Sequence, residues 1–109
     1  MTNIKIYRDK NKNIVKAEFD GHALFSNEND IVCSALSAVS YLTANGIENV
    51  AKVNIGHETG DGYLYFVLPC DIDEDKREKA NVLLESMYLF LTDLQKQYSD
   101  CISISDLEV

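Results

Sequence analysis

The sequence GHALFSNENDIVCSALSAVSY, residues 21–41, decides how this chain is organised. Its second half predicts an amphipathic helix from Ile31 to about Asn45, because apolar side chains recur there at helical spacing. The apolar positions are Val32, Ala35, Leu36, Val39 and Leu42. Alanine and serine are frequent among the remaining positions, and such short side chains let a helix lie close to a sheet. The stretch therefore predicts a polar loop followed by a helix that packs on a sheet.

A cysteine, Cys33, stands at the start of this predicted helix. Asp30 fits the N-cap position, since its carboxylate can accept hydrogen bonds from the unpaired N–H groups of the first turn. Cys33 is then the third helical residue, where those N–H groups and the positive end of the helix dipole favour a thiolate. A thiolate is the reactive form of cysteine. Position alone leaves two interpretations open, a nucleophile and an inert buried cysteine.

A nucleophilic cysteine needs a base within hydrogen-bond reach. His22 lies eleven residues before Cys33, which is enough chain for the loop between them to fold back across the helix start. Ser37 shares the helical face of Cys33, so its hydroxyl either supports the thiolate or bonds to a carbonyl of its own helix. The other histidine, His57, lies in a predicted turn and is either a competing base or a solvated loop residue.

The sequences on both sides of this stretch predict a sheet and a second helix. Alternating apolar residues predict a hairpin formed by residues 3–8 and 15–19, joined by the turn sequence DKNKN. Two further strands are predicted at residues 51–55 and 63–68, separated by the turn GHETGDG with a hairpin signal at Asp61-Gly62. Gly46 either ends the first helix or lies inside it. A last strand is predicted at residues 101–105, with Cys101 hidden beneath it.

The acidic sequence DIDED, residues 71–75, predicts the N-terminus of a long helix over about residues 74–98. It lacks the ligand spacing and the central glycine of a calcium loop. An apolar stripe predicts that this helix packs in the core, and it consists of Ala80, Leu83, Leu84, Met87, Leu91, Leu94 and Tyr98.

The predicted element order is ββαββαβ. We therefore predict a single two-layer α+β domain over residues 1–109, with two helices packed on one face of a five-stranded mixed or antiparallel sheet. The other face of the sheet must be polar or covered, and dimerisation through it is one way to cover it.

The composition is that of an ordinary folded domain with an acidic surface. Of 109 residues, 46% are hydrophobic and 26% are charged, and the net charge is −8. This charge disfavours direct binding to nucleic acid and suits a basic polypeptide partner, or it serves only solubility. Three cysteines and two histidines lack the spacing of a zinc site, so we expect no metal and no cofactor. The odd cysteine number, the lack of a signal peptide and the lack of a long apolar run predict a cytoplasmic protein without a membrane span.

The residues Gly21-His22-Ala23, followed by Asp30-Ile31-Val32-Cys33 and Ser37, resemble the pattern of the ribosomal-processing cysteine protease family, Prp or YsxB-like. The resemblance also covers the element order, the strand start at residues 62–66 and the long last helix. It implies a cytoplasmic, homodimeric endopeptidase that removes an N-terminal extension from a basic large-subunit ribosomal protein.

The resemblance also implies roles for individual residues. Cys33 is the nucleophile, His22 is the general base, and Asp30 and Ser37 support the site. The gate for the substrate is the loop of Ser26, Asn27, Glu28 and Asn29. Backbone N–H groups at the helix start stabilise the oxyanion. Asp30 acts either as a helix cap or as an orienter of His22.

The loop departs from the family pattern at one place. Family loops carry a glycine just before the Asp-Ile-Val-Cys segment, whereas this chain has Asn27-Glu28-Asn29. Asparagine tolerates a left-handed backbone, so the turn can persist, while the gating and the cleavage sequence stay open. Two other functions also fit the sequence, a non-catalytic module that binds a ribosomal protein or assembly intermediate, and a hydrolase of small thioesters or amides. An enclosed pocket would indicate the hydrolase, and a groove along the sheet rim would indicate a peptide substrate.

Overall fold

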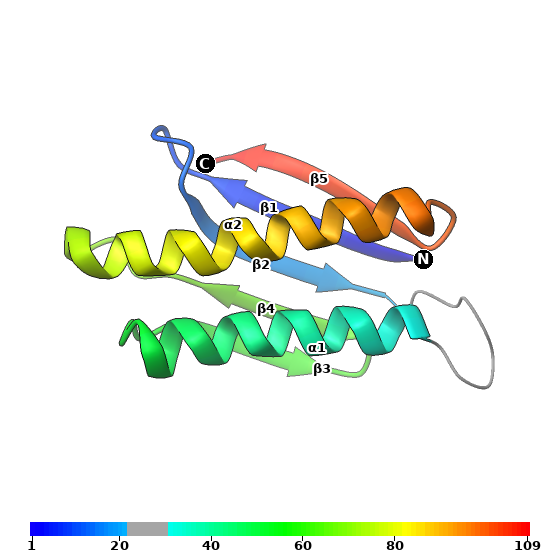
Figure 1. Cartoon of the computed structure of the whole chain (residues 1–109), viewed down its shortest axis with the longest axis horizontal. Helices are drawn as coiled ribbons and strands as arrows, with labels where there is room; N and C mark the ends of the chain where they lie inside the picture. The colour runs from blue at the N-terminus through cyan, green and yellow to red at the C-terminus, as the bar shows by residue number, and fades with distance from the viewer. Residues whose placement is uncertain (22–30) are drawn as a thin grey trace.

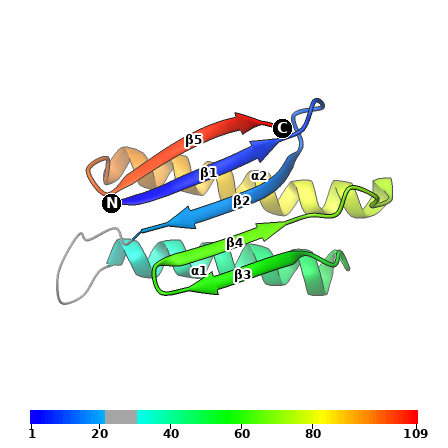
Figure 2. The same cartoon turned by 180° about the vertical axis from the view of Figure 1, so that it is seen from behind.

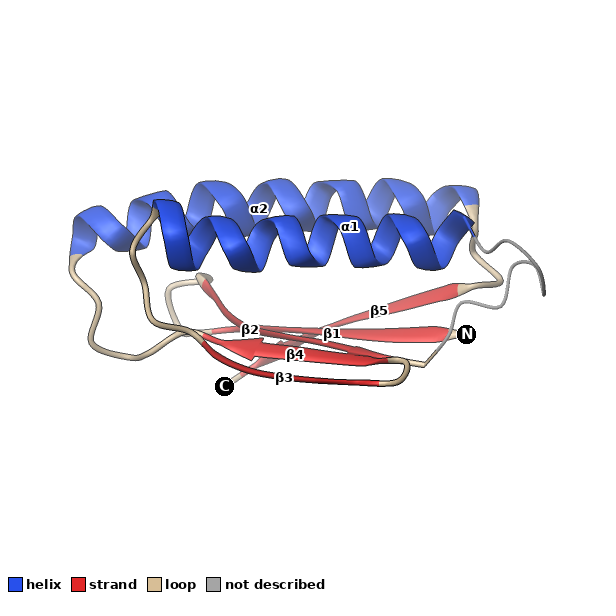
Figure 3. Ribbon diagram, turned by 90° about the horizontal axis from the view of Figure 1, so that it is seen from below, coloured by secondary structure: helices blue, strands red, loops and turns tan. Residues whose placement is uncertain are grey.

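The computed structural model describes residues 1–21 and 31–109, which form a layer of strands and a layer of helices (Figure 1). The strands are β1 (Thr2–Arg8), β2 (Ile14–Asp20), β3 (Gly56–Gly60), β4 (Tyr63–Val67) and β5 (Ile102–Glu108). The helices are α1 (Ile31–Asn45) and α2 (Glu74–Gln97), and a short π-helical segment, η1 (Gly46–Val50), continues α1. Both long helices lie on the same face of the sheet, which confirms the predicted architecture (Figure 3).

The sheet is mixed, with the strand order β3-β4-β2-β1-β5. The strand β5 runs parallel to β1, and the pairs β1–β2, β2–β4 and β3–β4 are antiparallel. The strands β3 and β5 are therefore the two edges, as seen from the open face in Figure 2. The predicted turn after β1 is confirmed, because the Asp9 N–H donates to the Asn13 carbonyl at 2.9 Å.

The face of the sheet that carries no helix is polar, which is one of the two expected solutions. The Lys5 ammonium lies 3.9 Å from the Glu18 carboxylate across the β1–β2 pair. The Lys16 ammonium lies 4.6 Å from the ring centroid of Tyr7 and 4.8 Å from that of Tyr65. Alternating charged and aromatic side chains thus make this face tolerant of water.

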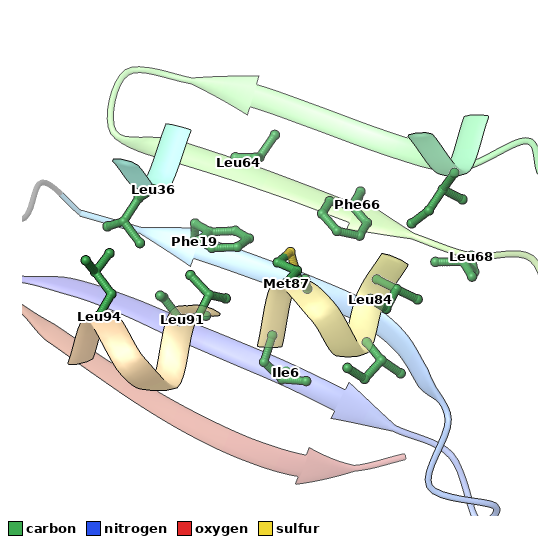
Figure 4. Close-up of a cluster of buried hydrophobic side chains, with 14 of the residues drawn as sticks. Ile6, Phe19, Leu36, Leu64, Phe66, Leu68, Leu84, Met87, Leu91 and Leu94 are labelled. Atoms are coloured by element: carbon green, nitrogen blue, oxygen red, sulfur yellow. The ribbon is translucent and has the colours of Figure 1, made fainter. Parts of the chain in front are cut away.

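The core lies between the two layers (Figure 4). The strands supply buried side chains at alternate positions, among them Ile4, Ile6, Ala17, Phe19, Leu64 and Phe66. The helix α2 supplies Ala80, Leu84, Met87, Leu91 and Leu94, with Leu83 and Tyr98 partly buried at the margin. The apolar stripe predicted for α2 is confirmed.

The apolar stripe predicted for α1 is correct except at Leu42, since Ala35 and Val39 pack against the core as well. Val32 and Leu36 are buried, whereas Leu42 is 70% exposed. The buried positions in the second half are Ser40 and Thr43. Their hydroxyls donate to helix carbonyls at 3.1 and 2.7 Å, so each polar group is buried with a hydrogen bond.

The acidic sequence before α2 is a helix N-terminus, as predicted. Asp73 is the N-cap, and its carboxylate accepts a hydrogen bond from the Lys76 N–H at 2.9 Å. Glu74 and Asp75 follow in the first turn, where negative charge suits the helix dipole.

A cluster of polar contacts connects α2 to the strands β1 and β5. Arg8 on β1 donates two hydrogen bonds to Glu85, at 2.7 and 3.1 Å, and its guanidinium lies 4.9 Å from the ring centroid of Tyr88. The Tyr88 hydroxyl donates to Asp106 on β5 at 2.6 Å. These contacts join α2, β1 and β5.

The prediction of a strand at residues 51–55 is wrong, because the strand is the following segment, β3. Lys52 has a φ of 62°, a left-handed conformation that interrupts an extended chain. Ala51 and Val53 are buried as anchors of an irregular connection, and the Val53 N–H donates to the Ile47 carbonyl of η1. The predicted turn is therefore shorter than GHETGDG and consists of Asp61-Gly62 alone.

The structure also shows how α1 ends and where the last strand lies. The α-helix ends at Asn45 and helical backbone continues through Gly46 in η1, so each interpretation of that glycine is partly correct. The last strand is longer than predicted, while Cys101 before it is buried as expected. Within residues 1–21 and 31–109, no helix is long and apolar enough to cross a membrane.

Candidate active site

Cys33 is the third residue of α1, as the sequence predicts, and it is partly buried. The N–H groups of the first turn of a helix have no partner within the helix. Together with the helix dipole they place positive potential beside the sulfur. The local position of Cys33 therefore suits a nucleophile.

A cavity of about 260 Å³ opens beside Cys33, between the start of α1 and the adjacent ends of β2 and β4. It is lined by Thr2, Phe19, Gly21, Cys33, Leu36, Ser37, Ser40, Tyr41, Gly60, Gly62, Tyr63 and Leu64. Phe19, Leu36 and Leu64 are buried core residues and make its inner wall apolar. Glycines of the β3–β4 hairpin stand at its edge. The cavity offers space for part of a substrate next to the sulfur.

Ser37 lies on the same side of α1 as Cys33, as predicted, and both residues line the cavity. Ser37 is exposed, and its backbone carbonyl accepts a hydrogen bond from the Ser40 hydroxyl. The two interpretations of the Ser37 side chain, support of the thiolate or a bond to its own helix, stay predictions.

Gly21 fixes the point at which the chain leaves β2 toward His22. Its φ is +97°, and a Cβ atom at this position would lie 2.5 Å from the Met1 carbonyl oxygen, so the position requires glycine. The Gly21 N–H donates to the Gly62 carbonyl at 2.7 Å, and the Gly21 carbonyl accepts a hydrogen bond from the Thr2 hydroxyl at 3.0 Å. Three segments distant in sequence therefore meet at this edge of the cavity.

Thr2, Gly60 and Gly62 are residues of the cavity wall that the sequence analysis missed. For Thr2 a signal exists, because the alternation of β1 places it on the same face as Ile4 and Ile6. For the two glycines no local signal exists beyond the hairpin turn, since their place beside Cys33 depends on strand order.

Tyr63, at the start of β4, also lines the cavity. Its hydroxyl donates to the Glu18 carboxylate at 3.0 Å. Desolvation, this hydrogen bond and the neighbouring carboxylates raise the pKa of Tyr63 to about 12. Tyr63 is therefore a neutral hydrogen-bond donor at neutral pH.

Several predicted site residues, His22, Asp30 and the gate residues Ser26, Asn27, Glu28 and Asn29, lie outside the described residues, so their roles stay predictions. His57 is not in a turn but in β3, where it is exposed. Cys70 is exposed and Cys101 is buried. Among residues 1–21 and 31–109, no group of three or more His, Cys, Asp or Glu side chains is placed to hold a metal ion.

Comparison with known proteins assigns the chain to a family. The family described as cysteine protease Prp matches residues 1–103. The chain belongs to the Prp cysteine protease family. One Prp relative, the ribosomal processing cysteine protease Prp of Bacillus subtilis (strain 168), is 31% identical over 108 residues, which are 96% of each protein. The resemblance seen in the sequence is thereby confirmed.

Solved structures show the Prp fold as well. The essential ribosomal processing protease Prp from S. aureus, in complex with a covalently linked product peptide, has a TM-score of 0.86 and 21% identity, covering 97% of this chain and 99% of that chain. A crystal structure of a Streptococcus mutans protein has a TM-score of 0.80 and 26% identity, covering 100% of this chain and 96% of that chain. The predicted fold class is confirmed by these likenesses.

Proposed function

We propose that this protein is a cysteine endopeptidase that removes the N-terminal extension from the precursor of a large-subunit ribosomal protein. The observation that carries the proposal is Cys33 at the start of α1, beside an open cavity, in a chain of the Prp cysteine protease family. The B. subtilis relative is a ribosomal processing protease by name, and the S. aureus relative has also been crystallised in complex with a substrate peptide.

The chemistry is acyl transfer with Cys33 as nucleophile and His22 as general base. His22 takes the thiol proton, and the thiolate attacks the carbonyl carbon of the scissile bond. Backbone N–H groups at the start of α1 stabilise the oxyanion, each worth about 10²–10³ in rate. The amine leaves with the proton from His22, and water then hydrolyses the thioester and restores the thiol. Asp30 and Ser37 support this arrangement.

The charge of the protein supports a basic substrate. With a net charge of −8, the surface attracts positively charged polypeptides and increases their rate of encounter. A cytoplasmic location, where ribosomal proteins are made, belongs to the same proposal.

A homodimer is also part of the proposal. The open face of the sheet is polar and needs no cover. In contrast, an apolar groove of about 440 Å³ lies between α1 and α2, with Ala38, Leu42 and Phe90 among its lining residues. The groove is thus the better supported interface. If it is, Leu42→Glu shifts the sedimentation coefficient toward the monomer, and Lys5→Gln on the open sheet face does not.

The decisive test is incubation of the purified protein with the full-length ribosomal protein precursor from the same organism, followed by intact mass spectrometry. One defined N-terminal cut is expected, and both Cys33→Ala and His22→Ala should abolish it while leaving the thermal unfolding midpoint nearly unchanged. Cleavage at the normal rate by Cys33→Ala would refute the assigned nucleophile. A stable complex with the precursor that never yields a product would favour the non-catalytic binding module instead.

A further inference from the structure

We propose that the substrate peptide binds as an added strand along the free edge of β3, with its scissile bond at the end of β3 next to Cys33. The inference rests on the proposed peptidase function and specifies how the substrate is held. The class of ligand is an extended polypeptide segment, recognised first through its backbone.

The helix layer leaves β3 uncovered. His57 and Thr59 are paired with Phe66 and Leu64, which are buried beneath the helices, so all four side chains lie on the helix side of the sheet. Nevertheless every residue of β3 is exposed. The space above this edge strand is therefore open to solvent and accessible to a peptide.

The backbone of β3 has donors and acceptors that β4 does not use. Gly60 pairs with Tyr63 across the two-residue turn Asp61-Gly62. In a hairpin of this kind the two residues that flank the turn are hydrogen-bonded to each other, and the pattern alternates along the strand. The N–H and C=O groups of His57 and Thr59 therefore point away from β4. Such a row of backbone donors and acceptors is a template for another strand.

Cys33 lies close to the end of this free edge. Cys33, Ser37 and Tyr41 are spaced by one helical turn and lie along one side of α1. All three line the same cavity as Gly60, the last residue of β3. In Figure 1, α1 runs beside the β3–β4 hairpin, with its N-terminus near the turn of that hairpin. The added strand would thus lie between this side of α1 and β3.

The length of the cavity side of α1 matches the length of β3. The distance along α1 from Cys33 to Tyr41 is about 12 Å at the usual helical rise. The length of β3 from Gly56 to Gly60 is about 13 Å at the rise of a strand. About four residues of an extended peptide fit along this length. Gly60 and Gly62 at the cavity edge lack side chains that would keep a peptide away from the sulfur.

Binding along the edge of β3 predicts that alternate side chains of the substrate peptide are recognised. Successive side chains of a strand point to opposite faces of the sheet. Every second side chain of the bound peptide would therefore point toward the helix layer, and the one next to the scissile bond would enter the cavity with Phe19, Leu36 and Leu64 on its inner wall.

The first experiment compares Thr59→Pro with Thr59→Ala. Proline removes the N–H at the free edge and is tolerated on edge strands, whereas alanine removes the same side chain and keeps the N–H. We expect Thr59→Pro to lower kcat/KM for the precursor about 10-fold, the effect of one lost hydrogen bond, and by several-fold more than Thr59→Ala. The thermal midpoint and the rate of Cys33 alkylation by iodoacetamide report on the fold and on the nucleophile.

The second experiment uses the unmodified protein, so it stands even if Thr59→Pro does not fold. Precursor peptides are methylated at one backbone nitrogen at a time, along the four residues on each side of the scissile bond. Strand pairing predicts that methylation lowers kcat/KM about 10-fold at every second backbone nitrogen, on one side of the scissile bond. Losses without alternation, or none, would refute the added strand.

The same peptides are also titrated into Cys33→Ala, with fluorescence anisotropy as the measure of binding. Cleavage by the unmodified protein without alternation in kcat/KM or in binding would leave the proposed function intact and refute the added strand. Alternation in binding with no cleavage by the unmodified protein would support the added strand and refute the proposed function.

Discussion

The two edge strands of the sheet, β5 and β3, differ in what lies above them. The helix α2 covers the start of β5, where Ile102 is 1% exposed, and the exposed Asp106 farther along β5 accepts a hydrogen bond from Tyr88 of the helix. In contrast, β3 is exposed along its whole length, including the two residues that face the helix layer. The cavity beside Cys33 lies between the start of α1 and the ends of β2 and β4, and Gly60 of β3 also lines it. The start of β5 is thus buried beneath a helix, whereas β3 is open to solvent and borders the cavity beside Cys33.

The two helices explain this difference. The 24 residues of α2 carry an uninterrupted apolar stripe, and its N-terminus is capped by Asp73. The 15 residues of α1 carry Cys33, Ser37 and Tyr41 on the side that lines the cavity, where a core helix would have large apolar residues. A site that must admit a polypeptide cannot be covered in the same way as a core. The division between the two sides can be tested by mutating each of them.

The largest expected effect is on the β3 side. Cys33→Ser retains nearly the same shape but replaces the sulfur by a hydroxyl oxygen, which is a much weaker nucleophile at neutral pH. Because the nucleophile acts in the transition state, kcat/KM should fall by about 10³-fold or more, with no change in the urea midpoint beyond about 0.5 kcal/mol of unfolding free energy. Activity within tenfold of the original would contradict the role of Cys33.

The next effect is on the α2 side. Leu84 is fully buried in the core, and Leu84→Ala should lower the free energy of unfolding by about 2–5 kcal/mol, through lost contacts and a cavity. Urea denaturation measures the loss. Val82→Ala on the same helix is the control, since Val82 is 68% exposed and should change stability by about 0.5 kcal/mol or less. The value of kcat/KM per folded molecule should stay unchanged, and a parallel loss would show that the two sides are coupled.

A smaller effect is expected from the contacts that join β1 to α2. Arg8→Leu removes two hydrogen bonds to Glu85, whose side chain is 44% exposed, so solvent screening limits the loss to about 1 kcal/mol. The control is Lys79→Ala, which breaks an exposed ion pair with Asp75 worth about 0.5 kcal/mol or less. Equal losses for both variants, measured in urea, would show that the Arg8 contacts do not stabilise the β5 side.

The smallest effect concerns pH. The pKa of Tyr63 is raised to about 12 in the folded state, from the ordinary value of about 10, so the protonated phenol is favoured by folding. Its contribution to stability is complete below pH 10 and is lost as the pH rises from about 10 toward 12. The thermal midpoint of the unmodified protein should therefore fall more steeply over this range than that of Tyr63→Phe.

Tyr88 provides the matched case at the β5 edge. Its hydrogen bond to Asp106 and its burial raise its pKa. Ionisation of Tyr88 at alkaline pH should therefore also lower the stability of the protein, and Tyr88→Phe should remove this loss. If the thermal midpoints of both variants changed with pH in the same way as that of the unmodified protein, these effects of Tyr63 and Tyr88 on stability would be contradicted.

Prediction from the sequence was accurate where contacts are local and failed where they are not. The periodicity of residues 31–45 marked α1 correctly but assigned Leu42 to the core, whereas Ser40 and Thr43 are the residues buried in the second half of the helix. Residues 51–55 have the pattern of a strand because two of them anchor in the core, while the sheet takes the next segment, whose polar sequence gives no strand signal. Packing overrode intrinsic preference in both places.

By itself the sequence determined the position of Cys33 near a helix start, the acidic N-terminus of α2 and the turn at Asp61-Gly62. Each of these features depends on interactions within a few residues, which composition and spacing encode. Only the tertiary structure decided that β5 is parallel to β1, that β3 is left uncovered and that Thr2, Gly21 and Gly62 meet beside the cavity. Those features arise from contacts between residues far apart in the chain, and such contacts are set by the packing of whole layers rather than by the pattern of any one segment.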